Sequence, residues 1–163
     1  MRRFLLIAAL VVASSVVAAT PAAAQKPVKE PSPAHPDEVL TDICAFPILV
    51  QEVVNKIKTI TFPDGRMIFN GAAKVRVTNL DTQKSILVNA SGAGVLRPRD
   101  DGGFTIKGTG HWFWIFRAGE LEPGAPAQLL HTVGRVIFTF TGTGEMSLVG
   151  GRRTDLCQRL AAP

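Results

Sequence analysis

The chain of 163 residues has few of the residues that carry catalysis: it holds two cysteines, three histidines and only 19% charged residues. It contains no C-x-x-C redox motif and no G-x-S-x-G nucleophile motif. Ser91-Gly92-Ala93-Gly94 and Gly108-Thr109-Gly110 resemble phosphate loops only in glycine content, because the Lys-Ser/Thr ending and the following helix are missing. No redox, hydrolase or nucleotide-binding signature is therefore present.

Nucleic-acid-binding patterns are also missing. The basic residues that would gather into an anion-attracting patch are Arg97, Arg99, Arg152, Arg153 and Arg159. They are not interleaved with aromatic side chains, and no recognition-helix pattern accompanies them. We therefore expect solvated arginines and no nucleic-acid partner.

What is present begins with a secretion signal. Met1, Arg2 and Arg3 form a basic head, residues 4–19 are apolar or small, and Ala22 to Ala24 form a cleavage pattern. We expect a signal peptide over residues 1–24, whose removal leaves 139 residues and lowers the net charge from +5 to +3. No membrane span should then remain, and a secreted, extracellular or cell-envelope location follows. A retained anchor is the alternative.

The rest of the chain divides into a tether and one domain. Residues 25–38 hold four prolines among polar residues, a composition that favours a disordered, solvated tether. With 46% hydrophobic residues overall, residues 39–163 suit a single β-domain, because apolar and polar residues alternate repeatedly between turn signals. Residues 66–78 are the clearest half-buried strand, following the turn Pro63-Asp64-Gly65.

We count about seven or eight strands in an antiparallel meander, with a helical turn near residues 154–160. Cys44 and Cys157 lie near the two ends of the domain, and in an oxidising compartment we expect them to form a disulfide. A meander whose ends meet closes into a small β-barrel. Glycines in the apolar register fit barrel corners, at Gly71, Gly92, Gly94, Gly108, Gly110 and Gly134. A β-sandwich is the alternative.

The aromatic run of residues 112–116 is the most unusual segment. Trp112, Trp114 and Phe116 share the core face of their strand, so Phe113 and Ile115 need a second cover. The loop of residues 118–127, a partner protein or another subunit would each supply it, and we favour a cover within the chain.

Polar candidates for chemistry are sparse. His111 is a candidate base, although a histidine on a polar strand face is the plainer interpretation. Asp64 and Arg66 flank Gly65 and suit a local ion pair within their turn. We expect no catalytic residue, no metal and no cofactor.

Five segments resemble a family of small secreted actinobacterial β-rich proteins of unknown function: Cys44-Ala45-Phe46-Pro47, Phe62-Pro63-Asp64-Gly65-Arg66, Val75-Arg76-Val77-Thr78-Asn79, Gly108-Thr109-Gly110 and Asp155-Leu156-Cys157. The resemblance spans nearly all of the predicted domain. It implies a secreted bacterial protein and supports the cysteine pairing, but it implies no activity.

The leading hypothesis is a secreted, non-enzymatic barrel that binds a small apolar or amphipathic ligand. Its interior would be lined by Phe69, Val88, Trp112, Trp114, Phe138 and Phe140. The alternative is a cell-envelope or protein-interaction module with a filled core. A third hypothesis is a cofactor-free isomerase or cyclase-like enzyme, which would require His111 to meet Asp64 or Arg66.

Overall fold

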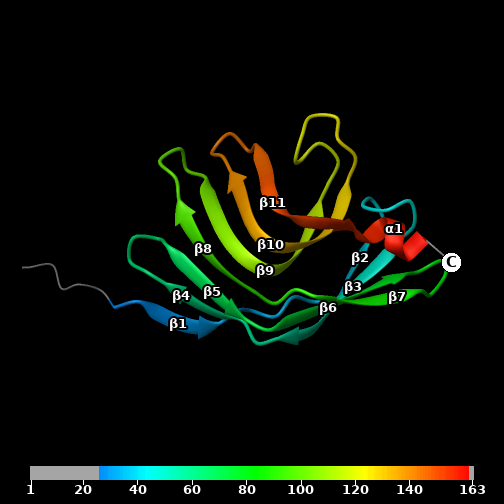
Figure 1. Ribbon diagram of the computed structural model, residues 1–163, viewed down its shortest axis with the longest axis horizontal. Coiled ribbons are helices and arrows are strands. Elements are labelled where there is room, and N and C mark those ends of the chain that lie inside the picture. Colours follow the sequence, from blue (N-terminus) through cyan, green and yellow to red (C-terminus); the bar gives the residue numbers. More distant parts are fainter. Residues whose placement is uncertain (1–25, 162–163) are drawn as a thin grey trace, which may run out of the picture.

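The computed structural model describes residues 26–161 and shows an all-β chain that ends in a short helix (Figure 1). The predicted signal peptide lies outside these residues. In chain order the elements are β1 (Val28–Pro31), β2 (Glu38–Leu40), β3 (Ile48–Asn55), β4 (Lys58–Thr61), β5 (Met67–Gly71), β6 (Ala73–Asn79), β7 (Ser85–Asn89), β8 (Gly92–Pro98), β9 (Phe104–Phe116), β10 (Gln128–Phe140), β11 (Met146–Asp155) and α1 (Leu156–Ala161). The predicted helical turn is thus confirmed.

Three long strands bend in the middle, which splits each into two elements. β3 continues into β4, β5 into β6, and β7 into β8, with only one or two residues between the halves. At one bend a Cβ on Gly71 would stand 2.3 Å from the carbonyl oxygen of Lys56, so only glycine lets the neighbouring backbones approach this closely. The expected strand bend at Gly71 is therefore confirmed, although it divides two sheets and is not the corner of a barrel.

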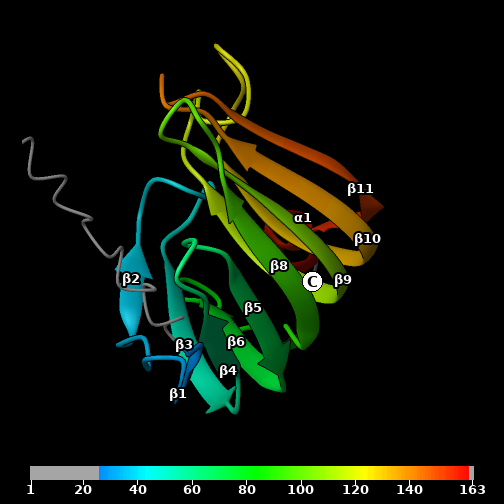
Figure 2. The same cartoon turned by 90° about the vertical axis from the view of Figure 1, so that its left-hand side faces the viewer.

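Because the long strands bend, the meander forms two antiparallel sheets (Figure 2). One has seven strands in the order β1-β4-β5-β8-β9-β10-β11, and the other has four in the order β2-β3-β6-β7. Every hairpin expected from the turn signals is present. The predicted alternative, a β-sandwich, is correct in having two sheets. It differs from the structure in that each bent strand runs from one sheet into the other.

The expected closure into a barrel is wrong. Within the described residues β1 pairs only with β4 and β11 only with β10, so the ends of the seven-stranded sheet stay apart (Figures 1 and 2). The physical reason is α1, which follows β11 directly and contacts β10 and β6. Its Leu156 and Leu160 are fully buried, so hydrophobic packing of the helix joins the two sheets at β6 and β10, while the edge strands β1 and β11 do not pair with each other.

The main core lies between the four-stranded sheet, β10 and α1. Its fully buried members include Ile48, Val77 and Leu129, each of which stabilises the fold by roughly 1.5–3 kcal/mol through burial. Phe113 and Ile115 pack against this core. The second face of the aromatic run is therefore covered within the chain, by the core beneath the four-stranded sheet.

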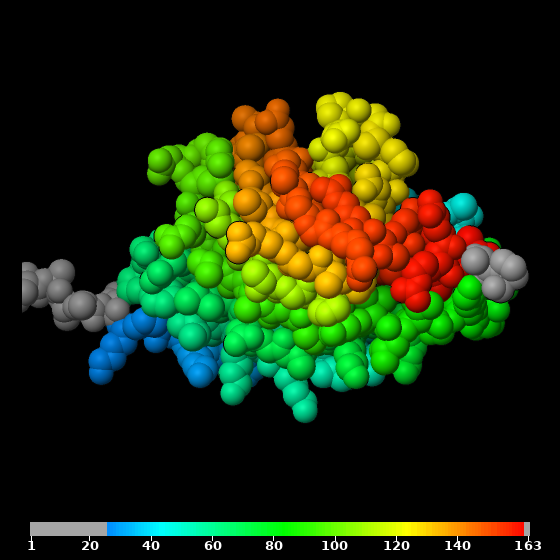
Figure 3. Space-filling view, viewed as in Figure 1, coloured from blue at the N-terminus to red at the C-terminus, as the bar shows by residue number. Residues whose placement is uncertain are grey.

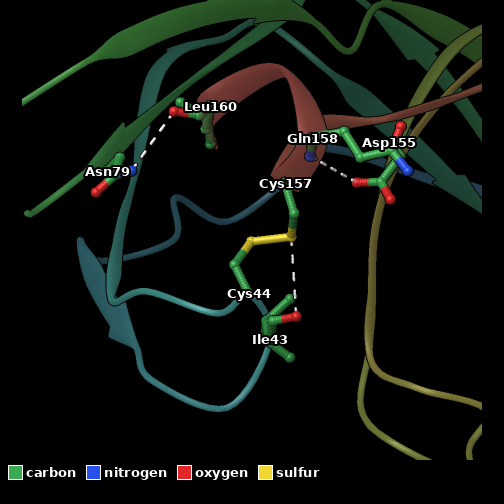
Figure 4. Close-up of a disulfide and its surroundings, with 7 residues drawn as sticks. All are labelled: Ile43, Cys44, Asn79, Asp155, Cys157, Gln158 and Leu160. Carbon is green, nitrogen blue, oxygen red and sulfur yellow. Dashed lines mark hydrogen bonds between the residues drawn. A yellow bond between two sulfur atoms is a disulfide. The ribbon is translucent and has the colours of Figure 1, made fainter. Parts of the chain in front are cut away.

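The disulfide between Cys44 and Cys157 is confirmed, with the two Cα atoms 5.5 Å apart (Figure 4). Its expected role of joining the ends of the domain is wrong, because β1 and β2 precede Cys44. The bridge instead links the loop between β2 and β3 to α1, and so connects the two sheets. Nearby, the side chain of Asn79 donates a hydrogen bond of 3.5 Å to the carbonyl of Leu160 (Figure 4).

Candidate functional site

An open cavity of about 330 Å³ lies on the inner side of the bend between the sheets. Phe69, Ala73 and Val75 reach it from one face of the bent β5–β6 strand, and Trp112 and Phe113 reach it from β9. The remaining lining residues are Ser32, His35, Glu52, Asn55, Ile57, Ala90, Gly92 and Ile106. Its volume lies at the lower end of the range for small-molecule sites, and its walls are mainly apolar with a few polar groups, as in such sites.

Glycines on adjacent strands make room for the indole of Trp112. A Cβ on Gly108 would stand 2.4 Å from the ring, and one on Gly94 would stand 2.7 Å from it. These two glycines are paired across β8 and β9. The indole N–H donates to the carbonyl of Thr109 at 3.2 Å. The ring is therefore held against a strip of backbone and presents part of its surface to the cavity.

The segment expected to be a free tether forms part of the cavity rim. Val28–Pro31 forms β1 and pairs with β4 while staying exposed. Beyond it, the hydroxyls of Ser32 and Thr59 share a hydrogen bond of 2.7 Å, and the amide of Asn55 donates to the carbonyl of Pro33 at 3.0 Å. Disorder was expected because the composition buries nothing, but these polar contacts order the segment against β3 and β4.

Glu52 and His35 are the charged or titratable residues in the cavity lining. The backbone N–H of His35 donates to the Oε2 atom of Glu52 at 2.8 Å. On β3, Glu52 lies on the same interior-facing side as Ile48 and Val50, and this position brings it to the cavity. A glutamate in the apolar register of a strand was the available signal in the sequence, and our interpretation missed it.

Only part of the predicted ligand-binding set lines this cavity. Phe69 and Trp112 do so, whereas Val88 is buried in the main core. Trp114, Phe138 and Phe140 belong to a second hydrophobic cluster on the same face of β9 and β10 as Trp112. The sequence correctly placed them on one face, but strand alternation does not reveal how far along that face a cavity extends.

The second cluster is an aromatic core. Trp114 stacks between Trp112 and Phe116, with ring centroids 5.4 and 6.0 Å away. Its indole N–H donates at 2.9 Å to the hydroxyl of Thr132, a fully buried residue. Leu121, from the loop after β9, packs onto this cluster. That loop thus covers the Trp114 face with Leu121, while Ala127 at its end packs against the main core, as Phe113 does.

The polar candidates do not converge. His111 stacks on His131, with ring centroids 5.3 Å apart and a hydrogen bond of 3.2 Å between Nδ1 of His111 and Nε2 of His131. Burial, followed by the neighbouring His111, lowers the pKa of His131 below its ordinary value of 6.5. Asp64 and Arg66 lie in the β4–β5 turn, where their predicted ion pair spans 4.0 Å. None of these residues lines the cavity.

A second hollow of about 420 Å³ lies between the loop after β9 and the β10–β11 turn, two of the three connections that project from one side of the molecule in Figure 3. Glycines and polar side chains make up most of its lining.

Residues 26–161 contain no cluster of three or more metal-ligating side chains. No helix in this part of the chain has the length and apolarity needed to cross a membrane.

Comparisons with known proteins identify no relative. No family model matches the chain, and neither a curated protein nor a solved structure is detectably similar to it. The resemblance to small secreted actinobacterial proteins therefore stays a prediction, and the site must be interpreted from its own residues.

Proposed function

We propose that this protein binds a small apolar or amphipathic molecule in the cavity between its sheets. The observation that carries the proposal is the cavity of about 330 Å³ with Phe69, Val75 and Trp112 in its walls and polar groups at its rim. Bent strands and the disulfide hold the two sheets around this space, so the site is preformed. Binding therefore requires little ordering of the protein, and the free-energy cost of such ordering is small.

A secreted or cell-envelope location belongs to the same proposal. It is supported by the apolar run at residues 4–19 and by the disulfide, since disulfides persist in oxidising compartments. Mass spectrometry of protein recovered from the secretion medium should give a chain that begins at Gln25. A chain that retains residues 1–24 would contradict the cleavage.

Binding is best tested with a neutral apolar dye, N-phenyl-1-naphthylamine, whose emission rises in apolar surroundings. We expect a saturable rise with the wild-type protein. Val75→Phe should abolish it, because the larger ring fills the cavity that Val75 lines. Val149→Phe is the matched control, since Val149 is 61% exposed on β11 and does not line the cavity.

Two outcomes would overturn this function. One is the absence of saturable binding by the wild-type protein, which would favour the alternative of a module that acts through its surface. The other is equal loss of binding in Val75→Phe and Val149→Phe, which would place the dye elsewhere.

A further inference from the structure

Most polar groups in the cavity lining already have partners within the protein. The side-chain amide of Asn55 donates to the carbonyls of Pro33 and Ser32, and its oxygen accepts from the N–H of Ile57. The hydroxyl of Ser32 is bonded to Thr59. These groups shape the rim, and a ligand would have to break existing hydrogen bonds to use them.

Glu52 differs because most of the acceptor positions of its carboxylate have no hydrogen-bond partner within residues 26–161. Its carboxylate accepts one hydrogen bond, at Oε2 from the N–H of His35, and it has no salt-bridge partner within residues 26–161. An ionised carboxylate only accepts hydrogen bonds and offers about four lone-pair positions. It is also the one acidic residue among those that line the cavity.

Aromatic rings surround the same space. Phe69, Trp112 and Phe113 line the cavity together with Glu52. The face of an aromatic ring attracts a cation, most strongly where water is partly excluded. A carboxylate and aromatic rings in one small apolar cavity favour a positively charged head group attached to an apolar body.

We propose that the ligand is a small amphipathic amine, whose protonated nitrogen contacts Glu52 and whose apolar part packs between Phe69 and Trp112. This inference rests on the proposed binding function. The same arrangement disfavours an anionic head group, because a second carboxylate beside Glu52 would be repelled.

The test compares three compounds that share one tail and differ in the head group: octylamine, octanol and octanoate. Each is titrated against the bound dye at pH 7, below its micellar concentration. We expect octylamine to bind about tenfold more tightly than octanol, the effect of a charge-assisted hydrogen bond, and octanoate to bind more weakly than octanol. Added salt should reduce the difference in affinity between octylamine and octanol, because it screens the attraction between the amine and the carboxylate.

Glu52→Gln should remove the preference for octylamine while octanol still binds, because the amide can still accept from the N–H of His35. Glu122→Gln, an exposed change of the same kind outside the cavity, should retain the preference. Equal binding of octylamine and octanol by the wild-type protein overturns the amine inference and leaves the binding function intact. If the dye binds but none of the three compounds displaces it, the amine inference is overturned, whereas the absence of dye binding overturns the binding function itself. Should Glu52→Gln fail to fold, the wild-type head-group ratio and its salt dependence decide the matter.

Discussion

A Cβ atom on Gly108 would stand 2.4 Å from the indole ring of Trp112, too close for any real side chain. The two residues lie on the same face of β9, four positions apart. The ring therefore occupies the space above the glycine, and the position of one cavity wall depends on the absence of a side chain at residue 108.

Gly108→Ala should displace Trp112 and disturb the cavity. We expect a loss of about 1–3 kcal/mol in the free energy of unfolding, the usual effect of overpacking, together with weaker binding of the apolar dye. Urea denaturation and dye titration measure the two effects.

Gly102→Ala separates this clash from backbone strain. Gly102 has a φ of +83°, but a Cβ there would meet nothing within 4 Å, so only a strain of about 1 kcal/mol is expected. Dye binding by this control should be unchanged. If both alanine variants bind the dye as wild type does, the placement of Trp112 over Gly108 is not important for the site.

Thr132→Val should destabilise the aromatic cluster. The change keeps the shape of the buried side chain but removes the hydroxyl that accepts from the indole N–H of Trp114 at 2.9 Å. An unpaired buried donor costs about 1–3 kcal/mol, which urea denaturation will detect.

Thr109→Val is the matched control: Thr109 is exposed, and Trp112 donates to its backbone carbonyl. We expect a change within about 0.5 kcal/mol there. Equal effects of the two substitutions would contradict the role of the Thr132 hydroxyl.

The strand pattern was predictable because it depends on local alternation and turns. Residues 66–78 alternate through a bend without changing face, and the turn at Asp64 and Gly65 closes the expected hairpin. That the seven-stranded sheet stays open was not predictable, since a disulfide between Cys44 and Cys157 is compatible either with strand pairing or with a helix packed between two sheets. Leu156 and Leu160 join the two sheets through a helix that the sequence indicated only as one turn.

The residues that line the cavity were predictable only in part, because strand alternation is a local pattern and does not report contacts between distant segments. Phe69 and Trp112 follow from strand alternation, but Ser32 and His35 come from a segment whose composition indicated a solvated tether. That segment is ordered by individual hydrogen bonds to Asn55, Thr59 and Glu52. Such contacts depend on the three-dimensional placement of β3 and leave no periodic pattern in the sequence.

Removal of the disulfide should destabilise the protein by about 2–5 kcal/mol, since the bridge closes a long loop with a sequence separation of 113 and restricts the unfolded chain. The double variant Cys44→Ala with Cys157→Ala should unfold at lower urea than wild type, and reductant should lower the wild-type midpoint to the same value. Because the chain has only these two cysteines, reductant should not affect the double variant. An unchanged wild-type midpoint under full reduction would show that α1 holds the sheets together without the bridge.

Acid should weaken the fold through His131. Its pKa is lowered in the folded protein, first by burial, then by His111 and by Arg159 and Arg152. The unfolded chain, with a pKa near 6.5, therefore binds a proton more readily than the folded protein does. Folding stability must then fall as the pH drops through 6.5 toward the lower folded value, and rise to a plateau above 6.5.

His131→Gln should flatten this part of the pH profile, because glutamine does not titrate. The free energy of unfolding is measured by urea denaturation between pH 4 and pH 8, and the slope below the ordinary histidine pKa is compared with that of wild type. His35→Gln is the control, since His35 lies exposed at the cavity rim, away from the stacked pair on β9 and β10. A variant at residue 131 that keeps the full wild-type slope would assign the acid sensitivity to other groups. If His131→Gln is less stable at every pH, the slope still decides, because a uniform loss of stability shifts the whole curve without changing its slope.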